Sequence, residues 1–366
     1  LDLDAMDRNI DRVRDDLAGR DYRIVAKSLP GEALLSHVMA RSGSSRLMVF
    51  HGRFAEAIAR RHPRADLLFG KPMPAAVADA FLRAEHAEGF EAAKRVQWLI
   101  DSPERFRQYR ELADAHRVSL RLNFEIDVGL HRGGFRDPAE LARLVREIER
   151  APRLGLGGLM GYDPHVAKLP EAFGLRAREF ERVVDRYRAF RSVLPPGAPE
   201  RVLNNAGSPT HRLRQDVDGV AGEVSVGSAL VKPTDFDLDT LPEHEPALFI
   251  ATPVLKASDG LVLPGLDGLG ALHGLWDRNR RRTFFVYGGY WQARPVSPPG
   301  LDTNPVFGRS SNQEMLNGSQ GVALDVDDFV FYRPTQSEFV MLQFGDVAIV
   351  RGGEIVDFWT PFGASA

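Results

Sequence analysis

One lysine is placed where a barrel enzyme would need a reactive amine. Lys27 ends the first apolar run of the chain, Tyr22–Lys27, and seven further strand-like runs follow it. If these runs are the strands of a β/α barrel, Lys27 lies at the carboxyl end of the first strand. Barrel enzymes carry their chemistry at that end. A lysine amine there could form a Schiff base with an aldehyde.

Two loops further along the chain have the composition of a phosphate site. Asn205, Gly207 and Ser208 follow the seventh run, and Gly227 and Ser228 lie within the eighth. Glycine allows close backbone approach, serine hydroxyls donate hydrogen bonds, and a helix beginning at Pro209 would present its amino end to an anion. Many barrels hold phosphate in these two loops. A phosphate here and an amine at Lys27 fit pyridoxal phosphate, lying across the barrel mouth.

Two further strand-end residues could contact such a cofactor. Arg132 follows the fifth run and could hydrogen-bond the phenolate oxygen of the ring, while Tyr162 follows the sixth and could cover one ring face. Taken singly, a strand-end lysine, arginine or tyrosine is more often structural, and Asn-Asn-Ala-Gly-Ser is first of all a turn. It is their common order along the chain that favours a shared site.

The elements that must position these residues alternate between strand-like and helix-like patterns up to about residue 232. Several helix-like runs begin with a capping residue followed by proline, and strands that alternate with helices imply a parallel sheet. The predicted strands are Tyr22–Lys27, Arg46–Phe50, Asp66–Phe69, Val96–Asp101, Ser119–Ile126, Leu154–Gly161, Arg201–Asn204 and Glu223–Val231. The predicted helices include Pro74–Glu88, Pro103–His116, Pro138–Ala151 and Glu171–Val193.

The sequence therefore predicts an α/β protein with two domains. A (β/α)8 TIM-type barrel spans residues 5–235, and an antiparallel β domain follows over 236–366, with residues 1–4 as a candidate addition to its sheet. The predicted β runs of the second domain are Ala247–Lys256, Thr283–Tyr287, Asp327–Tyr332, Phe339–Phe344, Asp346–Val350 and Glu354–Trp359.

Composition narrows the function classes. The chain has 366 residues, of which 43% are hydrophobic and 27% charged, as in ordinary globular proteins. A formal net charge of −3 gives no support for a nucleic-acid or anionic-membrane partner. Cysteine is absent, which excludes disulfides, thiolate metal sites and a cysteine nucleophile. No run reaches the roughly 18 apolar residues of a membrane span, so a cytoplasmic location is expected.

The motifs together resemble those of a known family. Arg-Ile-Val-Ala-Lys-Ser around Lys27, Glu-Ile-Asp-Val-Gly-Leu-His-Arg ending at Arg132, Gly-Leu-Met-Gly-Tyr ending at Tyr162 and Gly-Glu-Ile-Val-Asp-Phe-Trp over 353–359 occur in the family's order. The chain is similar over nearly its whole length to the alanine-racemase-like (fold type III) pyridoxal-phosphate enzymes. Within that family it resembles the D-threonine aldolase and D-serine dehydratase branch.

The resemblance implies a role for each candidate residue. Lys27 would be the Schiff-base lysine, with Arg132 and Tyr162 beside the cofactor. The phosphate would lie near Asn205 to Ser208, including Gly207, and near Gly227 and Ser228. The resemblance also implies an amino-acid substrate and a homodimer, with each site near the subunit interface.

The residues at positions 336 and 338 differ from those usual in this branch. Its members usually carry a metal pair in the β domain, a histidine followed two positions later by cysteine or aspartate. Here Gln336 and Glu338 stand at those positions. An amide oxygen is a poor ligand for Zn²⁺ or Mn²⁺ beside imidazole. Either Glu338 holds a weakly bound hard cation or the protein has no metal site, and we favour no metal site.

The replacement shifts the expected reaction. A carboxylate at Glu338 can accept a β-hydroxyl proton, as aldol cleavage requires, but it cannot assist a departing hydroxide as a Lewis acid. The leading hypothesis is therefore a lyase that cleaves β-hydroxy-D-amino acids, with Lys27 and Glu338 as catalytic residues. The structural alternative for Glu338 is a solvated turn carboxylate.

Three other functions remain open at this point. Elimination from a D-serine-like substrate, as in a dehydratase or deaminase, is the runner-up. Racemisation is weaker because no tyrosine opposite the lysine can be identified, Tyr287 and Tyr332 being candidate stand-ins. A non-catalytic pyridoxal-phosphate carrier is weaker still, because such proteins typically consist of the barrel alone.

Overall fold

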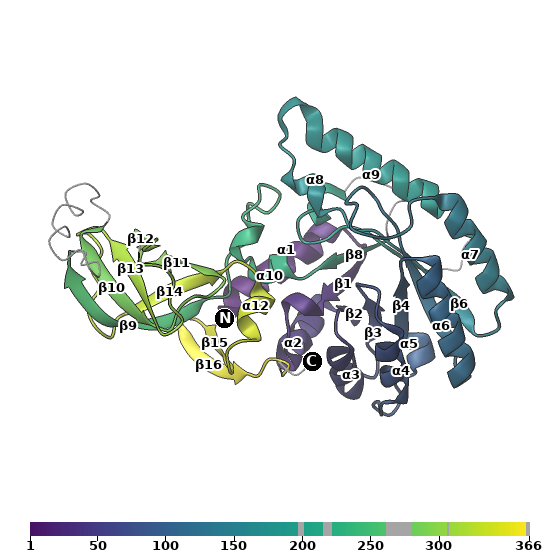
Figure 1. The fold of residues 1–366 in the computed structure, drawn as a ribbon, viewed down its shortest axis with the longest axis horizontal. Coiled ribbons are helices and arrows are strands. Elements are labelled where there is room, and N and C mark those ends of the chain that lie inside the picture. The colour runs from purple at the N-terminus through teal and green to yellow at the C-terminus, as the bar shows by residue number, and fades with distance from the viewer. Residues whose placement is uncertain (197–200, 215–221, 261–279, 306, 364–366) are drawn as a thin grey trace.

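Eight parallel strands close into a barrel in the order β1 to β8 (Figure 1). The computed structural model describes residues 1–196, 201–214, 222–260, 280–305 and 307–363. The strands are β1 Asp21–Val25, β2 Arg46–Val49, β3 Asp66–Phe69, β4 Val96–Ile100, β5 Leu120–Glu125, β6 Leu154–Met160, β7 Val202–Asn204 and β8 Glu223–Val226. The predicted TIM-type barrel is thus confirmed.

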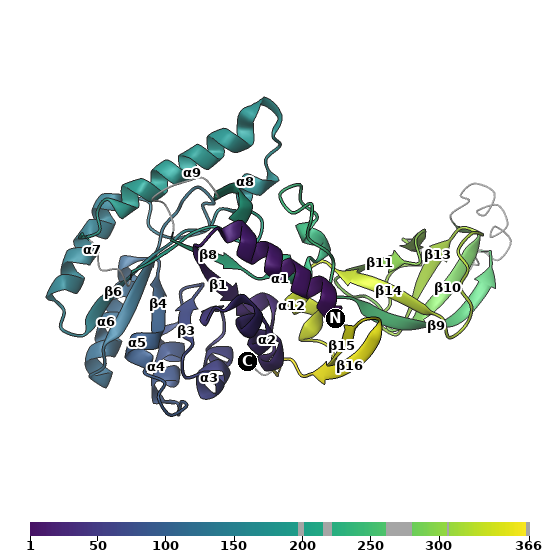
Figure 2. The same ribbon diagram turned by 180° about the vertical axis from the view of Figure 1, so that it is seen from behind.

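Helices cover the outside of the barrel, and the longer ones pack on it through buried apolar residues. In α7 these residues are Leu141, Leu144, Val145 and Ile148, one face of a helix. Figure 2 shows α1 running along the barrel near β8. The helices are α1 Leu3–Leu17, α2 Glu32–Ser42, α3 Gly52–Arg61, α4 Ala75–Arg83, α5 Ala92–Arg95, α6 Pro103–His116, α7 Pro138–Arg150, α8 Pro164–Lys168, α9 Leu175–Arg191, α10 Ser228–Val231 and α12 Ser337–Met341.

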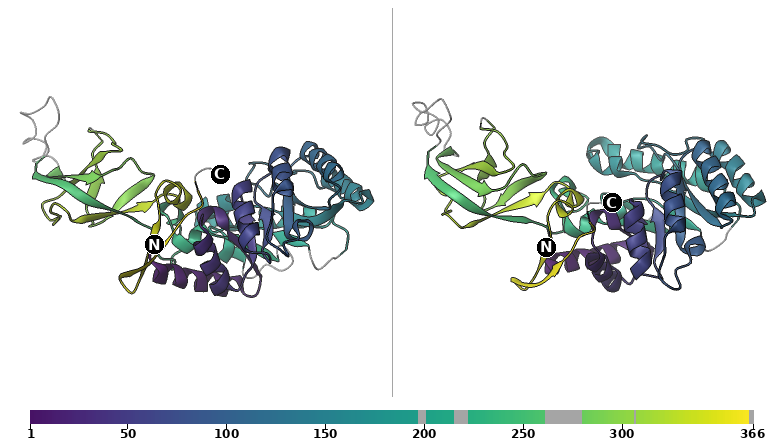
Figure 3. Two further views of the ribbon diagram at one scale, coloured as in Figure 1. Left: turned by 90° about the horizontal axis from the view of Figure 1, so that it is seen from below. Right: turned by 60° about the horizontal axis from the view of Figure 1, so that its bottom comes forward.

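The second part of the chain forms a separate antiparallel sheet that projects from one side of the barrel (Figure 3). Its strand order is β11-β14-β9-β10-β13-β12. A two-stranded sheet, β15 and β16, lies with α12 between this sheet and the barrel (Figure 1). The strands are β9 Ile250–Asp259, β10 Arg282–Tyr287, β11 Ala293–Ser297, β12 Leu301–Thr303, β13 Gln313–Gly318, β14 Phe329–Pro334, β15 Val347–Arg351 and β16 Glu354–Trp359. The expected β domain is present.

Three local predictions need correction. Phe339–Phe344 is not a strand, because Ser337–Met341 forms helix α12. The eighth barrel strand ends at Val226, and the chain turns at once into α10. Only Leu1 and Asp2 of residues 1–4 pair with β15, since Leu3 begins α1 and the Asp2 side chain accepts the Ala5 amide proton at 2.9 Å.

The barrel interior is polar at its amino-terminal end. Arg23 of β1 is completely buried, and its guanidinium donates to Glu223 Oε1 at 2.5 Å and to Asp66 Oδ1 at 2.6 Å. It also donates to the carbonyl oxygens of Leu47 and Asp66. A buried cation of this kind is tolerated only when its donors are satisfied, as they are here.

We expect Arg23→Leu to destabilise the fold strongly. Glu223 would keep its buried carboxylate, only 2% exposed, without its main cation. Breaking a buried pair in this way costs about 3–5 kcal/mol. Urea unfolding of the full chain measures the loss. Arg83→Leu, which removes an exposed partner of Asp79, should cost about 1 kcal/mol or less. Equal losses in the two variants would contradict the buried-charge argument.

Within the described ranges, no helix combines the length and the apolar character needed to cross a membrane.

Candidate active site

A cavity of about 250 Å³ lies at the carboxyl ends of the barrel strands. Part of its lining is apolar, since Met48 and Met160 belong to a small apolar cluster with Leu68 and Leu99. The cavity is lined by Val25, Lys27, Ser28, Met48, Phe50, Gly70, Arg132, Met160, Gly161, Tyr162, Asn204, Ala206, Gly207, Ser208, Ser225, Gly227, Ser228, Phe236 and Gln336. Seven of the predicted site residues are therefore together in one place.

Lys27 lies in a single turn of 3-10 helix, Ala26–Ser28, directly after β1. Its Nζ atom is 2.9 Å from Oε1 of Glu338 and 5.8 Å from the centre of the Phe50 ring. The Glu338 side chain is 17% exposed and that of Lys27 is 39% exposed, so the pair lies at the rim of the cavity rather than in open solvent. The two predicted catalytic residues, 311 positions apart in sequence, are thus in contact.

Helix α12 is fixed against the turn that carries Lys27. The hydroxyl of Ser337, adjacent to Glu338, donates to the carbonyl oxygen of Ser28 at 2.9 Å. Ser337 is fully buried. Ser28 follows Lys27 and Ser337 precedes Glu338 in the sequence. The hydrogen bond between the two serines therefore holds Lys27 and Glu338 close together.

The loops after β7 and β8 form a cup of hydrogen-bonding groups. The Ser208 hydroxyl oxygen accepts from the backbone N–H of Gly227 at 3.2 Å and of Ala229 at 3.1 Å. The hydroxyls of Ser28 and Ser228 lie 2.8 Å apart. We call Gly207, Ser208, Gly227 and Ser228 the phosphate cup. It gathers hydroxyl and amide donors from two loops, as an anion site requires.

Two glycines of the cup are needed for space. A Cβ atom at Gly207 would lie 2.5 Å from Cε2 of Tyr162, and one at Gly227 would lie 2.7 Å from Cβ of Val25. The φ angle of Gly227 is −150°, which other residues can adopt. Close approach of neighbouring groups therefore accounts for this glycine.

Tyr162 and Arg132 form a second wall. The Arg132 guanidinium carbon lies 5.2 Å from the centre of the Tyr162 ring, within cation–π range. Burial raises the pKa of Tyr162 to about 12, although the charge of Arg132 acts in the opposite direction. The phenol is therefore neutral at ordinary pH and keeps its proton for donation.

Asn205 behaves differently from the other predicted residues. It is fully buried but does not line the cavity. Neither its amide nitrogen nor its amide oxygen has a hydrogen-bond partner within the described ranges. A Cβ atom at Gly161 would lie 2.8 Å from the Asn205 oxygen, so the amide lies directly behind the cavity wall.

Sequence reasoning missed several lining residues. Phe50 and Ser225 follow or lie within barrel strands, and their strand-end positions were an available signal. Ser225 accepts a hydrogen bond from Asn204 Nδ2 at 2.8 Å. Phe236 lies in the connection to the β domain, and no sequence pattern indicates that it returns to the barrel mouth.

Two histidines that follow barrel strands, and the two tyrosines named above as stand-ins, do not line this cavity. His51 packs on Phe54, with ring centres 4.8 Å apart, and His165 faces Glu179 at 3.4 Å. Tyr332 is buried against Trp291, and Tyr287 is 67% exposed on the β domain.

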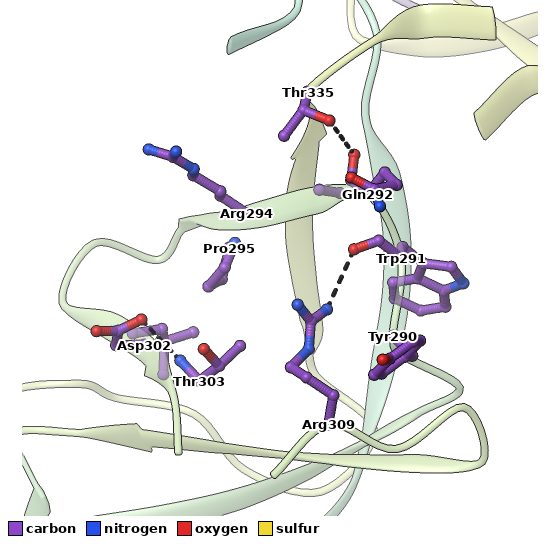
Figure 4. Close-up of a pocket in the computed structure, with 11 residues that line it drawn as sticks. Tyr290, Trp291, Gln292, Arg294, Pro295, Asp302, Thr303, Arg309 and Thr335 are labelled. Carbon is purple, nitrogen blue, oxygen red and sulfur yellow. Dashed lines mark hydrogen bonds between the residues drawn. The ribbon is translucent and has the colours of Figure 1, made fainter. Parts of the chain in front are cut away.

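A larger and more open hollow lies on the β domain, at about 610 Å³ (Figure 4). Arg309 donates to the carbonyl oxygen of Trp291 at 3.1 Å, and its guanidinium carbon lies 5.5 Å from the centre of the Tyr290 ring. This hollow contains neither Lys27 nor Glu338. No lysine lines it, so the barrel cavity is the candidate for the predicted chemistry.

The barrel cavity fits pyridoxal phosphate. An amine at the strand end and a glycine-lined cup of hydroxyl and amide groups supply an attachment point and polar contacts. The metal-pair positions fit a metal poorly. Gln336 Nε2 donates to Asp235 at 2.7 Å, and Glu338 pairs with Lys27. No cluster of three or more metal-binding side chains occurs among the described residues.

Comparisons with known proteins identify the family and the fold. The family model of the alanine racemase N-terminal domain matches residues 1–232. No curated protein sequence matches significantly. D-threonine aldolase from Filomicrobium marinum is 20% identical, with a TM-score of 0.76 over 98% of this chain and 93% of that chain.

Two further solved structures are similar. D-threo-3-hydroxyaspartate dehydratase from a Delftia species is 18% identical, with a TM-score of 0.76 over 99% of this chain and 96% of that chain. Alanine racemase from Bacillus anthracis is 17% identical, with a TM-score of 0.70 over 98% and 96%. The match to the family model covers more than half of the chain, and the chain therefore belongs to the alanine racemase N-terminal domain family, the fold type III pyridoxal-phosphate enzymes.

Proposed function

We propose that this protein is a pyridoxal-phosphate-dependent lyase that cleaves the Cα–Cβ bond of β-hydroxy-D-amino acids, giving an aldehyde and a smaller amino acid. The observation that carries the proposal is the 2.9 Å contact between Lys27 Nζ and Glu338 Oε1. It brings a carboxylate to the amine at which an amino acid would exchange. The preference for the D form is supported by the resemblance to D-threonine aldolase.

Seven residues that line the cavity have roles in this proposal. Lys27 would hold the aldehyde of the cofactor, and the phosphate cup would hold its phosphate. Tyr162 and Arg132 would orient the ring from one side. When bound, the cofactor supplies an electron sink for the bond that breaks.

Glu338 is proposed as the general base. Aldol cleavage needs a group that takes the β-hydroxyl proton while Cα–Cβ breaks. The carboxylate oxygen that now faces the ammonium group of Lys27 can accept this proton. A carboxylate cannot act as a Lewis acid for a departing hydroxide, which disfavours elimination. The bond between Ser337 and Ser28 keeps Glu338 at this position.

Product identification tests the proposal directly. The full-length chain, supplied with pyridoxal phosphate, is incubated with D-threonine and with D-serine. Acetaldehyde and glycine from D-threonine would support cleavage. Pyruvate and ammonia from D-serine as the main products would overturn it in favour of a dehydratase. Appearance of the L enantiomer would indicate a racemase, and a bound chromophore without turnover on a broad amino-acid panel would indicate a carrier.

We also propose that the protein is a homodimer. The β domain and the segment that follows it expose many large apolar side chains, as expected of a surface that another chain covers. These are Tyr287, Tyr290, Phe329, Phe331, Phe339, Phe344, Ile355, Val356 and Phe358. Sedimentation equilibrium of the cofactor-loaded protein tests this, and a monomer at micromolar concentration would exclude it.

A further inference from the structure

A completely buried histidine lies directly behind the phosphate cup. His211 begins a short 3-10 helix, His211–Arg214, next to α1. Its Nδ1 atom is 3.0 Å from the carbonyl oxygen of Ser208, and its Nε2 atom is 3.1 Å from Oδ2 of Asp16. A peptide carbonyl can only accept a hydrogen bond, so Nδ1 carries a proton.

The second ring nitrogen also faces an acceptor. Burial raises the pKa of Asp16, but the hydrogen bond from His211 and the charges of His211 and Arg212 outweigh it, so the pKa of Asp16 is lowered. Arg212 Nε lies 3.6 Å from the same carboxylate. Asp16 is therefore ionised and accepts from Nε2. Acceptors thus face both ring nitrogens of His211, an arrangement that a doubly protonated imidazole ring satisfies completely.

The groups packed around this ring are consistent with one buried positive charge. The ring of His244 meets that of His211 edge to face, with centres 5.6 Å apart. Burial, and next the charge of His211, lower the pKa of His244 to about 3, so His244 is neutral. Arg12 and Lys232 also act on His244, but Arg12 pairs with Glu245 at 3.0 Å and Lys232 donates to two backbone carbonyls.

The phosphate cup has no charge of its own, and a nearby positive charge would strengthen its hold on a phosphate dianion. Its own groups are hydroxyls and backbone amides, which are neutral. Among the described residues that line the cavity, the cationic side chains are Lys27 and Arg132. Lys27 is paired with Glu338 and would be consumed by the aldehyde, while Arg132 lies against the Tyr162 ring. Neither is available as the counter-charge of a phosphate dianion.

We infer that His211, held by Asp16, is a positioning residue for phosphate: it fixes Ser208 and supplies the positive charge that retains a phosphate dianion in the cup. It acts through Ser208, whose hydroxyl oxygen also meets the amides of Gly227 and Ala229. The phosphate itself would not touch the imidazole. The inference rests on the proposed function, because pyridoxal phosphate is the ligand it concerns.

The test compares two vitamers that differ only in the phosphate. Dissociation constants of pyridoxal phosphate and of pyridoxal are measured by absorption titration for the full-length protein and for His211→Gln. We expect affinity for pyridoxal phosphate to fall about tenfold, the effect of losing one nearby buried charge, and affinity for pyridoxal to stay the same. His116→Gln is the matched control, because His116 faces Asp79 at 2.6 Å on the barrel exterior.

A second measurement does not depend on the variant folding. Nitrogen-15 shifts of the histidine rings in the wild-type chain report whether both His211 nitrogens carry protons at neutral pH. A neutral ring would overturn the inference, and so would an equal loss of affinity for both vitamers or an unchanged affinity in His211→Gln. Wild-type protein that binds neither vitamer would instead overturn the proposed function, and the two failures are thereby distinguished.

Discussion

Replacing Lys27 with alanine is expected to abolish both covalent cofactor binding and turnover. Lys27 is the only lysine among the described residues that line the cavity, and its amine faces Glu338 at 2.9 Å. Without it the cofactor aldehyde has no amine to join, and no group returns the active site to its starting state. Loss of a residue that bonds covalently costs about 10⁴-fold or more in turnover.

The absorption spectrum gives the direct measurement. Wild-type protein supplied with pyridoxal phosphate should show the visible band of a lysine-bound cofactor, and Lys27→Ala should not. Lys71→Ala is the matched control, because Lys71 stands two residues past the end of β3 but does not line the cavity. A visible band that persists in Lys27→Ala, or one that disappears equally in Lys71→Ala, would refute the assignment.

The barrel was readable from the sequence because its signals are local. Each strand is a short apolar run, and helices such as α6 begin where Ser102 and Pro103 indicate. Lys27, Tyr162 and the phosphate cup follow from strand-end position alone, since parallel strands bring their carboxyl ends to one side. The order of these residues along the chain does not, however, predict the distances between their side chains.

The sequence predictions were wrong where tertiary contacts decide the secondary structure. The run Phe339–Phe344 has strand-like composition, yet the chain forms α12 because Ser337 is anchored to Ser28 and Val340 and Met341 are buried. Phe339 remains 53% exposed, so the apolar character of this run did not indicate burial.

The buried charged residues could not be predicted from the sequence either. Arg23 lies in an apolar run, and nothing local shows that its partners Glu223 and Asp66 arrive from strands 200 and 43 residues away. His211 was passed over for the same reason, since its carboxylate partner Asp16 lies on α1, which was not predicted. Polar residues held by distant partners require the fold before their role can be argued.

Glu338→Gln is expected to remove aldol cleavage while leaving cofactor binding nearly intact. Glutamine keeps the size of the side chain but cannot accept the β-hydroxyl proton as a base. Loss of a positioned general base costs about 10²- to 10⁴-fold in turnover. Because Lys27 remains, the visible band should form as in wild type. Acetaldehyde release from D-threonine, set beside a cofactor titration of the same preparation, makes the comparison.

A control substitution nearby distinguishes loss of the base from a general disturbance of the structure around it. Asp235→Asn removes the carboxylate that accepts from Gln336 at 2.7 Å, and it should change turnover only slightly because Asp235 faces neither Lys27 nor the cavity. Equal losses in both variants would point to a general disturbance of this corner of the site.

Chelator treatment of the wild-type protein tests whether turnover depends on a divalent cation. Both side chains at the metal-pair positions are held by protein groups, Gln336 by Asp235 and Glu338 by Lys27. Turnover should therefore survive removal of divalent cations, in contrast to an enzyme whose β-hydroxyl is bound by a metal. If a chelator abolished cleavage and Zn²⁺ or Mn²⁺ restored it, while Glu338→Gln remained active, Glu338 would not be the base and the β-hydroxyl proton would leave by another route.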